Sequence, residues 1–96
     1  MEITLLQQIL LKGKPNTYRS LYKKFKSNII PHKGDMITDS VWKDPYQYEV
    51  HEVAINYDAN ECYVTLGCIE LDSVNMEHIK HYIKMAKLHR WECNIL

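Results

Sequence analysis

The side chains best suited to chemistry are five histidines and three cysteines. Three of the histidines, His78, His81 and His89, fall in one predicted helix, and Cys93 follows closely. Zinc needs three or four nitrogen, sulfur or oxygen ligands that converge on one point. His78 and His89 are separated by about 16 Å of helical rise, so they cannot bind one ion together with His81. We therefore expect solvated histidines, with no metal and no cofactor.

Covalent catalysis would need a nucleophile beside a base, and Cys62 with His51 is the pair that could meet across two predicted strands. Because Cys62 alternates with Val64 and Leu66, we expect its side chain to point into the core instead. The chain contains no nucleophile elbow, phosphate-binding loop, dinucleotide-binding fingerprint or paired-histidine protease motif. We therefore predict that the protein is not an enzyme and has no catalytic residues.

Lysine and arginine crowd into residues 12–33, where aromatic residues are interleaved with them. Basic side chains that contact phosphates, next to aromatic rings that stack on bases, are how proteins hold single-stranded nucleic acid. The candidate nucleic-acid-binding residues are Arg19, Tyr22, Lys23, Lys24 and Lys26.

The charge of the whole chain argues against that function. The 12 basic and 12 acidic residues cancel, and the isoelectric point of about 6.9 lies far below that of typical nucleic-acid-binding domains. Residues 1–34 hold seven Lys/Arg and one Asp/Glu, residues 35–77 hold one and ten, and residues 78–96 hold four and one. Such opposed segments either pair within the fold, which is the safer expectation, or steer association with a complementary protein, including a second copy of the chain, which is the functional hypothesis.

An acidic loop rich in aromatic residues is the second candidate surface. Its candidate partner-binding residues are Trp42, Asp44, Tyr46 and Tyr48. Exposed tryptophan and tyrosine dominate the binding energy of protein interfaces. Trp42 has an alternative role, in which it caps the open end of a small barrel, and the sequence leaves both roles open.

The elements that would position these residues are mostly strands. Residues 2–11 fit a strand or a helix, and we favour a strand. We expect a short helix or turn at 17–22, a strand at 24–30 and another at 36–38. Residues 48–57 and 61–71 predict a hairpin, with a bulge near His51 and Glu52 where the alternation changes parity.

The last predicted element is a helix at residues 74–89, with Asp72, Ser73 or Asn75 as its cap. A helix after a run of strands predicts one α+β domain spanning residues 1–96, a small antiparallel bent sheet or partial barrel with the C-terminal helix packed on it. The predicted core comprises Leu21, Phe25, Ile37, Val53, Ile55, Val64, Leu66, Ile79, Ile83 and Ala86.

The compartment is suggested by the cysteines and by the distribution of apolar residues. Three cysteines without a paired spacing are typical of reduced thiols in a cytoplasm. No apolar run approaches the roughly 18 residues of a membrane helix, and the first residues lack a basic leader. We expect a cytoplasmic protein without a membrane partner.

The pattern P-x-x-G-D-x-I at residues 31–37, followed by the strands at 48–53 and 62–66, resembles small barrels of the Src-homology-3 type. The composition, rich in Lys, Ile, Asn and Tyr, is similar to that of short phage and prophage proteins of low-GC Gram-positive bacteria. The resemblance implies a barrel-like core and a mobile-element origin, and it carries over no catalytic residue.

These observations favour a non-enzymatic protein-interaction module, such as a phage accessory or host-modulating protein, that binds a protein partner or forms a homodimer. The alternative is a small nucleic-acid-binding module that uses the basic aromatic segment 12–33.

Overall fold

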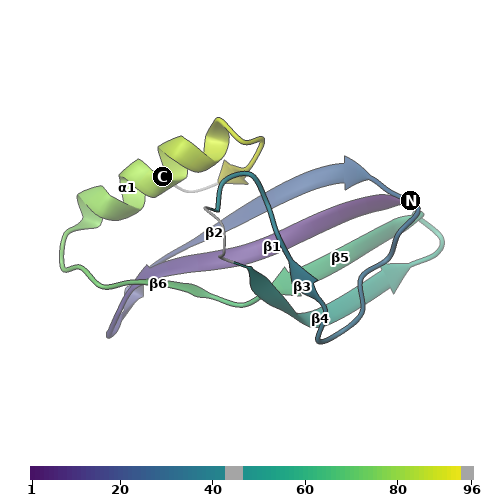
Figure 1. The fold of residues 1–96 in the computed structure, drawn as a ribbon, viewed down its shortest axis with the longest axis horizontal. Coiled ribbons are helices and arrows are strands. Elements are labelled where there is room, and N and C mark those ends of the chain that lie inside the picture. The colour runs from purple at the N-terminus through teal and green to yellow at the C-terminus, as the bar shows by residue number, and fades with distance from the viewer. Residues whose placement is uncertain (43–46, 94–96) are drawn as a thin grey trace.

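The computed structural model describes residues 1–42 and 47–93, which form seven strands and one helix (Figure 1). The strands are β1 (Glu2–Leu11), β2 (Lys14–Lys26), β3 (Met36–Ile37), β4 (Tyr48–Asn56), β5 (Glu61–Leu66), β6 (Ile69–Leu71) and β7 (Glu92–Cys93). The helix α1 (Met76–Lys87) lies between β6 and β7 in the chain. The strands form one sheet in the order β3-β4-β5-β1-β2-β7, with β6 paired to β1. The predicted combination of a sheet and a C-terminal helix is therefore confirmed.

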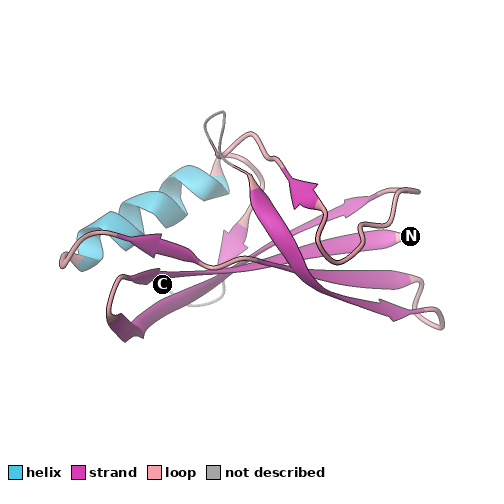
Figure 2. Ribbon diagram, turned by 60° about the horizontal axis from the view of Figure 1, so that its bottom comes forward, coloured by secondary structure: helices cyan, strands magenta, loops and turns pink. Residues whose placement is uncertain are grey.

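The sheet curls into an open half-barrel (Figure 2). We predicted an antiparallel sheet, but some of its strand pairs are parallel. β1 is antiparallel to β2 but runs parallel to both β5 and β6. The parallel pairs form because the chain, after passing through β2, β3 and β4, returns to the other side of β1 as β5 and β6. Contacts between segments so distant in the chain leave no mark on local periodicity, so the sequence alone did not indicate them.

The predicted hairpin is present as β4 and β5, and the bulge near His51 and Glu52 is confirmed by a shift in register between Val50 and Glu52. The second strand was predicted to be continuous to residue 71, but it breaks into β5 and β6 at Gly67. There Gly67 donates its N–H to the carbonyl of Glu49 and accepts a bond from the side chain of Gln7, at 3.0 and 2.9 Å. These two bonds satisfy the N–H and the C=O of Gly67, which has no partner strand where β5 ends.

The expectation of a helix or turn at 17–22 and a strand at 24–30 is wrong. Instead, one strand, β2, runs through Lys14–Lys26, and residues 27–30 leave the sheet. The apolar residues of this segment fit a helix and a strand almost equally. Pairing with β1, which extends from Leu11 opposite Lys14 to Glu2 opposite Lys26, decides in favour of the strand.

The C-terminal helix matches the prediction except for its bounds. Asn75 is the N-cap, and its side-chain oxygen accepts a bond from the N–H of Glu77 at 2.9 Å. Three predicted core residues of the helix, Ile79, Ile83 and Ala86, form an apolar stripe that is buried against the sheet. Figure 1 shows that α1 covers only the half of the sheet that lies away from the N-terminus.

We call the sheet face under α1 the inner face. Along β1 it carries the buried residues Ile3, Leu5, Ile9 and Leu11, and the opposite sheet face is the outer face. The remaining buried hydrophobic residues are Leu21, Trp42, Val50, Cys62, Val64, Leu66, Ile69, Ile79, Ile83, Ala86 and Trp91. Six of the ten predicted core residues are among them.

Four predicted core residues are not fully buried. Ile37 and Val53 are half-buried, whereas Phe25 and Ile55 are exposed by 40% and 39%. Phe25 pairs with Ile3 and Ile55 with Cys62, so both lie at the ends of one row across the sheet. The row is buried only at its centre, because its outer members lack a neighbouring strand on one side.

Candidate functional site

The loop that carries the predicted partner-binding residues turns into the molecule. Trp42 is only 8% exposed, and its ring lies edge-on to Tyr48, with the ring centroids 4.7 Å apart. Its indole N–H donates to the hydroxyl of Tyr82 at 3.0 Å. Of the two roles that the sequence left open for Trp42, core packing is the one that the structure shows. Asp44 and Tyr46 lie outside the described residues.

Tyr82 is held as a neutral phenol beneath this loop. Burial, the largest effect, raises the pKa of Tyr82 to about 12, although the hydrogen bond from Trp42 acts in the opposite direction. Because the neutral hydroxyl can still accept the indole N–H, the contact between the loop and α1 persists throughout the physiological pH range.

Asp39 anchors the same loop to β2 and to the chain after α1. Its carboxylate lies 2.6 Å from the ammonium of Lys23 and accepts bonds from the Trp91 indole and the Val41 amide, at 3.0 and 3.1 Å. Burial acts to raise the pKa of Asp39, but the three hydrogen bonds outweigh it, and the net pKa lies below the ordinary value. Lys23 is therefore part of an internal ion pair, not a side chain available to phosphate.

The five candidate nucleic-acid-binding residues do not form one surface. Because side chains alternate along β2, Arg19 and Lys23 project from the inner face, and Tyr22, Lys24 and Lys26 project from the outer face. On the outer face the Lys24 ammonium lies 5.9 Å from the centroid of the Tyr22 ring. The hydroxyl of Tyr22 interacts with Glu92, and this hydrogen bond is the main cause of a raised pKa for Tyr22.

The pair considered for covalent catalysis is not assembled. The register places Cys62 opposite Ile55, so His51 does not face it. The Cys62 side chain is fully buried, and burial raises the pKa of its thiol. A buried thiol with a raised pKa is a poor nucleophile, because the thiolate is the reactive form.

Two histidines contact serine hydroxyls instead of converging. His78 Nδ1 bonds Ser73 Oγ, and Ser73 Oγ also accepts the N–H of Asn75, so this pair belongs to the start of α1. His89, just after the C-terminal end of α1, has its Nδ1 2.8 Å from Ser40 Oγ. Throughout the described part of the chain, no three His, Cys, Asp or Glu side chains are grouped as metal ligands would be.

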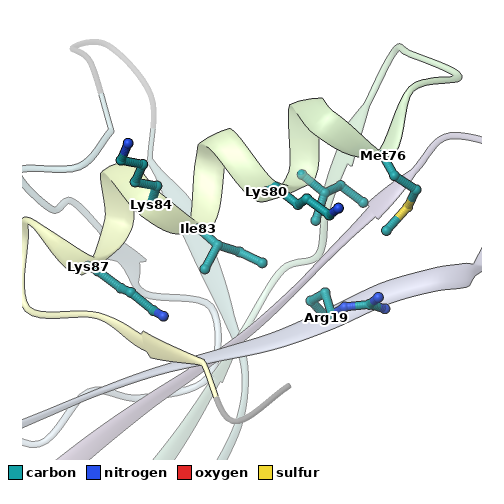
Figure 3. A pocket seen from close by; sticks show the side chains of 7 residues that line it. Arg19, Met76, Lys80, Ile83, Lys84 and Lys87 are labelled. Atoms are coloured by element: carbon teal, nitrogen blue, oxygen red, sulfur yellow. The ribbon is translucent and has the colours of Figure 1, made fainter. Parts of the chain in front are cut away.

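A groove of about 620 Å³ lies between α1 and β2 (Figure 3). The apolar side chains of Met76, Ile79 and Ile83 line its floor. Four basic residues also line it, Arg19 from β2 and Lys80, Lys84 and Lys87 from α1, and the Lys84 side chain points away from β2 (Figure 3). The groove lining contains no acidic residue. We call this surface the cationic groove.

Local sequence explains how the cationic groove is built. The lysines of α1 follow one another at intervals of four and three residues, so they form a row beside the buried stripe. Arg19 faces α1 because its register partner Ile9 is an inner-face residue of β1. The guanidinium donates to the Tyr18 carbonyl at 2.8 Å, which holds it at the edge of the groove.

Sequence reasoning missed this groove, although it named Arg19. It placed Arg19 in a basic segment that contacts nucleic acid and did not relate it to the lysines of the helix. The spacing of the lysines beside the apolar stripe was a usable signal for one half of the groove. The other half depends on the packing of α1 over β2, which local patterns do not report.

Within residues 1–42 and 47–93, no helix is long and apolar enough to cross a membrane. A scan of protein families, a search of curated proteins and a search of solved structures found nothing that matches this chain.

Proposed function

We propose that this protein is a non-enzymatic interaction module that binds an acidic, amphipathic segment of a protein partner in the cationic groove. The observation that carries the proposal is the composition of the groove lining, which combines an apolar floor with four basic residues and no acidic one; of the four, Lys80 is paired with Glu77, which lies outside the lining. An extended or helical segment with leucine-like residues on one side and carboxylates on the other would satisfy both features.

The same composition disfavours nucleic acid as the occupant. Binding of single strands depends on aromatic rings that stack on bases, and none of the residues lining the groove is aromatic. The tyrosines of β2 that could stack lie on the outer face, away from Arg19 and Lys23. Nucleic-acid binding through Lys24 and Lys26 remains the second hypothesis, because those two residues do share a face with Tyr22.

The similarity in composition to short phage proteins supports a host protein as the partner, since accessory proteins of mobile elements act by binding host components. A host-modulating role needs no catalytic group, which agrees with the buried thiol of Cys62 and the histidines bonded to Ser40 and Ser73.

The first experiment uses a fluorescein-labelled peptide of alternating glutamate and leucine, measured by fluorescence anisotropy. We expect wild-type protein to bind it, and Lys84→Glu/Lys87→Glu to weaken binding by about tenfold or more. A peptide of alternating lysine and leucine should not bind. Equal affinity of the wild type and the double variant for the acidic peptide would refute a role for the groove.

The matched control is Lys24→Glu/Lys26→Glu, which makes the same change of charge on the outer face. Peptide binding should survive in this variant. The alternative function is tested in parallel with a labelled 20-nucleotide single strand at about 50 mM salt, where phosphate contacts are strong. Binding of that strand by the wild type, and its loss in the control variant, would replace the proposed function with the alternative.

A further inference from the structure

The free edge of β4 is limited to a short stretch on the opposite side of the sheet from β2 and α1 (Figure 1). At Val50 the edge is already occupied, because Gly34 donates its N–H to the Val50 carbonyl and the Val50 N–H donates to Asp35, each at 2.8 Å. The turn of the hairpin begins at Tyr57. A strand from another molecule can therefore pair only with residues 52–56 of β4.

Within this stretch, Val53 and Ile55 point their backbone N–H and C=O groups away from β5. Every second residue of an antiparallel strand directs these groups to the same side. Val50, whose groups bond outward, pairs with Leu66. Val53 and Ile55 pair with the residues two and four positions before Leu66, so their groups point outward as well. Among the described residues, no strand pairs with these outward groups.

The stretch lacks the residues that protect strand edges. Native proteins place lysine and proline along exposed edges to prevent pairing with other chains. The end of β2 has this protection, because residues 23–26 contain three lysines. Residues 52–56 contain neither lysine nor proline, and Ile55 is exposed by 39%. Of the two edges, β4 is therefore the one open to a further strand.

Residues 52–56 are complementary to themselves in the antiparallel direction. A two-fold axis at Ala54 aligns 52–56 of one copy with 56–52 of a second copy. Val53 of each copy then faces Ile55 of the other on the inner face, and β-branched side chains form favourable cross-strand pairs. Because both residues direct their backbone groups outward, these two pairs are joined by about four N–H to C=O bonds.

The other side chains of the stretch fit the same arrangement. Ala54 meets its own copy at the axis, where Cα atoms of a non-hydrogen-bonded pair approach to about 4.5 Å and a methyl group leaves room. On the outer face, Glu52 faces Asn56 of the second copy. The Asn56 Oδ1 accepts the N–H of Ala59 at 3.2 Å, which leaves the Asn56 NH₂ group to donate to the Glu52 carboxylate.

The neighbouring registers are less favourable than the one centred on Ala54. Paired residues must lie on the same face, so the axis can move only to the next residue on either side. With the axis one residue later, Glu52 of one copy faces Asp58 of the other, and facing like charges are destabilising. With the axis one residue earlier, Asn56 needs the edge at Val50, which is already occupied.

We propose that two copies of this protein form a symmetric dimer in which residues 52–56 of β4 pair with the same residues of the second copy. A self-complementary patch is what a two-fold dimer requires. The buried row that ends at Ile55 then continues through Val53 of the second copy. The pairing uses the edge of β4 and not the cationic groove, so it stands independently of the proposed function.

Salt should strengthen this dimer. Its contacts are apolar side chains and backbone bonds, whereas the acidic residues around the stretch, among them Asp35, Glu49 and Asp58, repel those of the second copy at long range. We expect a dissociation constant of about 100 µM at about 500 mM salt, in keeping with a small interface, and at least about threefold weaker association at about 20 mM. Weaker association at high salt would overturn the proposal.

Sedimentation equilibrium at concentrations up to about 500 µM provides the first test. The wild type should approach twice the monomer mass of 11.4 kDa, and Ile55→Lys should remain a monomer. The matched control is Phe25→Lys, because Phe25 is almost equally exposed at the opposite end of the same row. A monomeric wild type, an Ile55→Lys protein that still dimerises, or loss of the dimer in Phe25→Lys would each overturn the proposal.

The register is tested by cross-linking, which does not depend on the folding of the Ile55 variant. Ala54→Cys is introduced with Cys68→Ser and Cys93→Ser, so that the fully buried Cys62 is the remaining native thiol. Across the axis, two residues at position 54 are close enough for a disulfide.

Glu52→Cys in the same background is the matched control, because its two copies would lie about 13 Å apart. Oxidised glutathione should therefore convert the Ala54→Cys protein into a covalent dimer and leave the Glu52→Cys protein a monomer on a non-reducing gel. A protein that dimerises without the cross-link at position 54, or that cross-links equally at position 52, pairs through another surface and would overturn the proposal.

Discussion

The carboxylate of Asp39 lies 2.6 Å from the ammonium of Lys23, and these side chains are only 9% and 16% exposed. Sixteen residues separate them in the chain, and the pair ties the loop before Trp42 to the inner face of β2. The Trp91 indole bonds the same carboxylate, so this one group joins β2, the loop and the segment after α1.

Replacing Asp39 should therefore be costly. Asp39→Asn leaves Lys23 nearly buried without a counter-charge, and we expect the free energy of unfolding to fall by about 3 kcal/mol. Urea denaturation followed by tryptophan fluorescence measures the loss, because both Trp42 and Trp91 are buried. Lys23→Met/Asp39→Asn should lose less than the sum of the single substitutions, and strict additivity would argue against a coupled pair.

Acid should unfold the protein in part through Asp39. Its pKa in the folded state is lower than the ordinary value of 3.8, so its contribution is fully present at neutral pH. That contribution disappears as the pH falls from 3.8 towards the lower folded-state pKa. Urea denaturation at several pH values between about 5 and 2 should show a steeper loss in the wild type than in Asp39→Asn. Asp58→Asn, in the exposed turn after β4, should behave like the wild type.

The bond between Trp42 and Tyr82 predicts a smaller effect. Tyr82→Phe removes the acceptor of the Trp42 indole N–H, which lies 3.0 Å away, and keeps the ring. We expect a loss of about 1–2 kcal/mol, the usual cost of leaving a buried donor unsatisfied. Thermal unfolding and the Trp42 emission spectrum both report the change, and Tyr57→Phe at an 80% exposed site is the matched control. A Tyr82→Phe protein as stable as the control would contradict a role for this bond.

Two glycines offer a matched pair of backbone tests. Gly13, in the turn between β1 and β2, has φ of +75°, a region that alanine adopts only with strain. Gly13→Ala should cost about 1 kcal/mol. Gly67→Ala should change the stability by less than about 0.5 kcal/mol, because the nearest atom to a new Cβ is at 3.5 Å in the His51 side chain and its φ is not positive. Chemical denaturation compares the two, and a reversed order would refute the argument.

Local chemistry was enough to predict the central hairpin and α1. In β5, the alternation of Cys62, Val64 and Leu66 matches the period of a strand, and all three are buried. The bulge between Val50 and Glu52 was readable because a bulge shifts the parity of that alternation. The cap was narrowed to Asp72, Ser73 or Asn75, because capping depends on a side chain and a backbone N–H two residues apart, and the structure shows that it is Asn75.

Only the tertiary structure decided which strands β1 pairs with, where β2 begins and how the basic residues are divided. The β2 segment fits two periodicities, and its choice of strand depends on pairing with β1. That choice sends Arg19 and Lys24 to opposite faces, which no count of charges reveals. The cationic groove requires Arg19 of β2 and Lys87 of α1, 68 positions apart in the chain, to line the same surface. Periodicity and capping arise between residues a few positions apart, so the sequence reports them, whereas strand order and packing arise between segments that meet only in the folded chain.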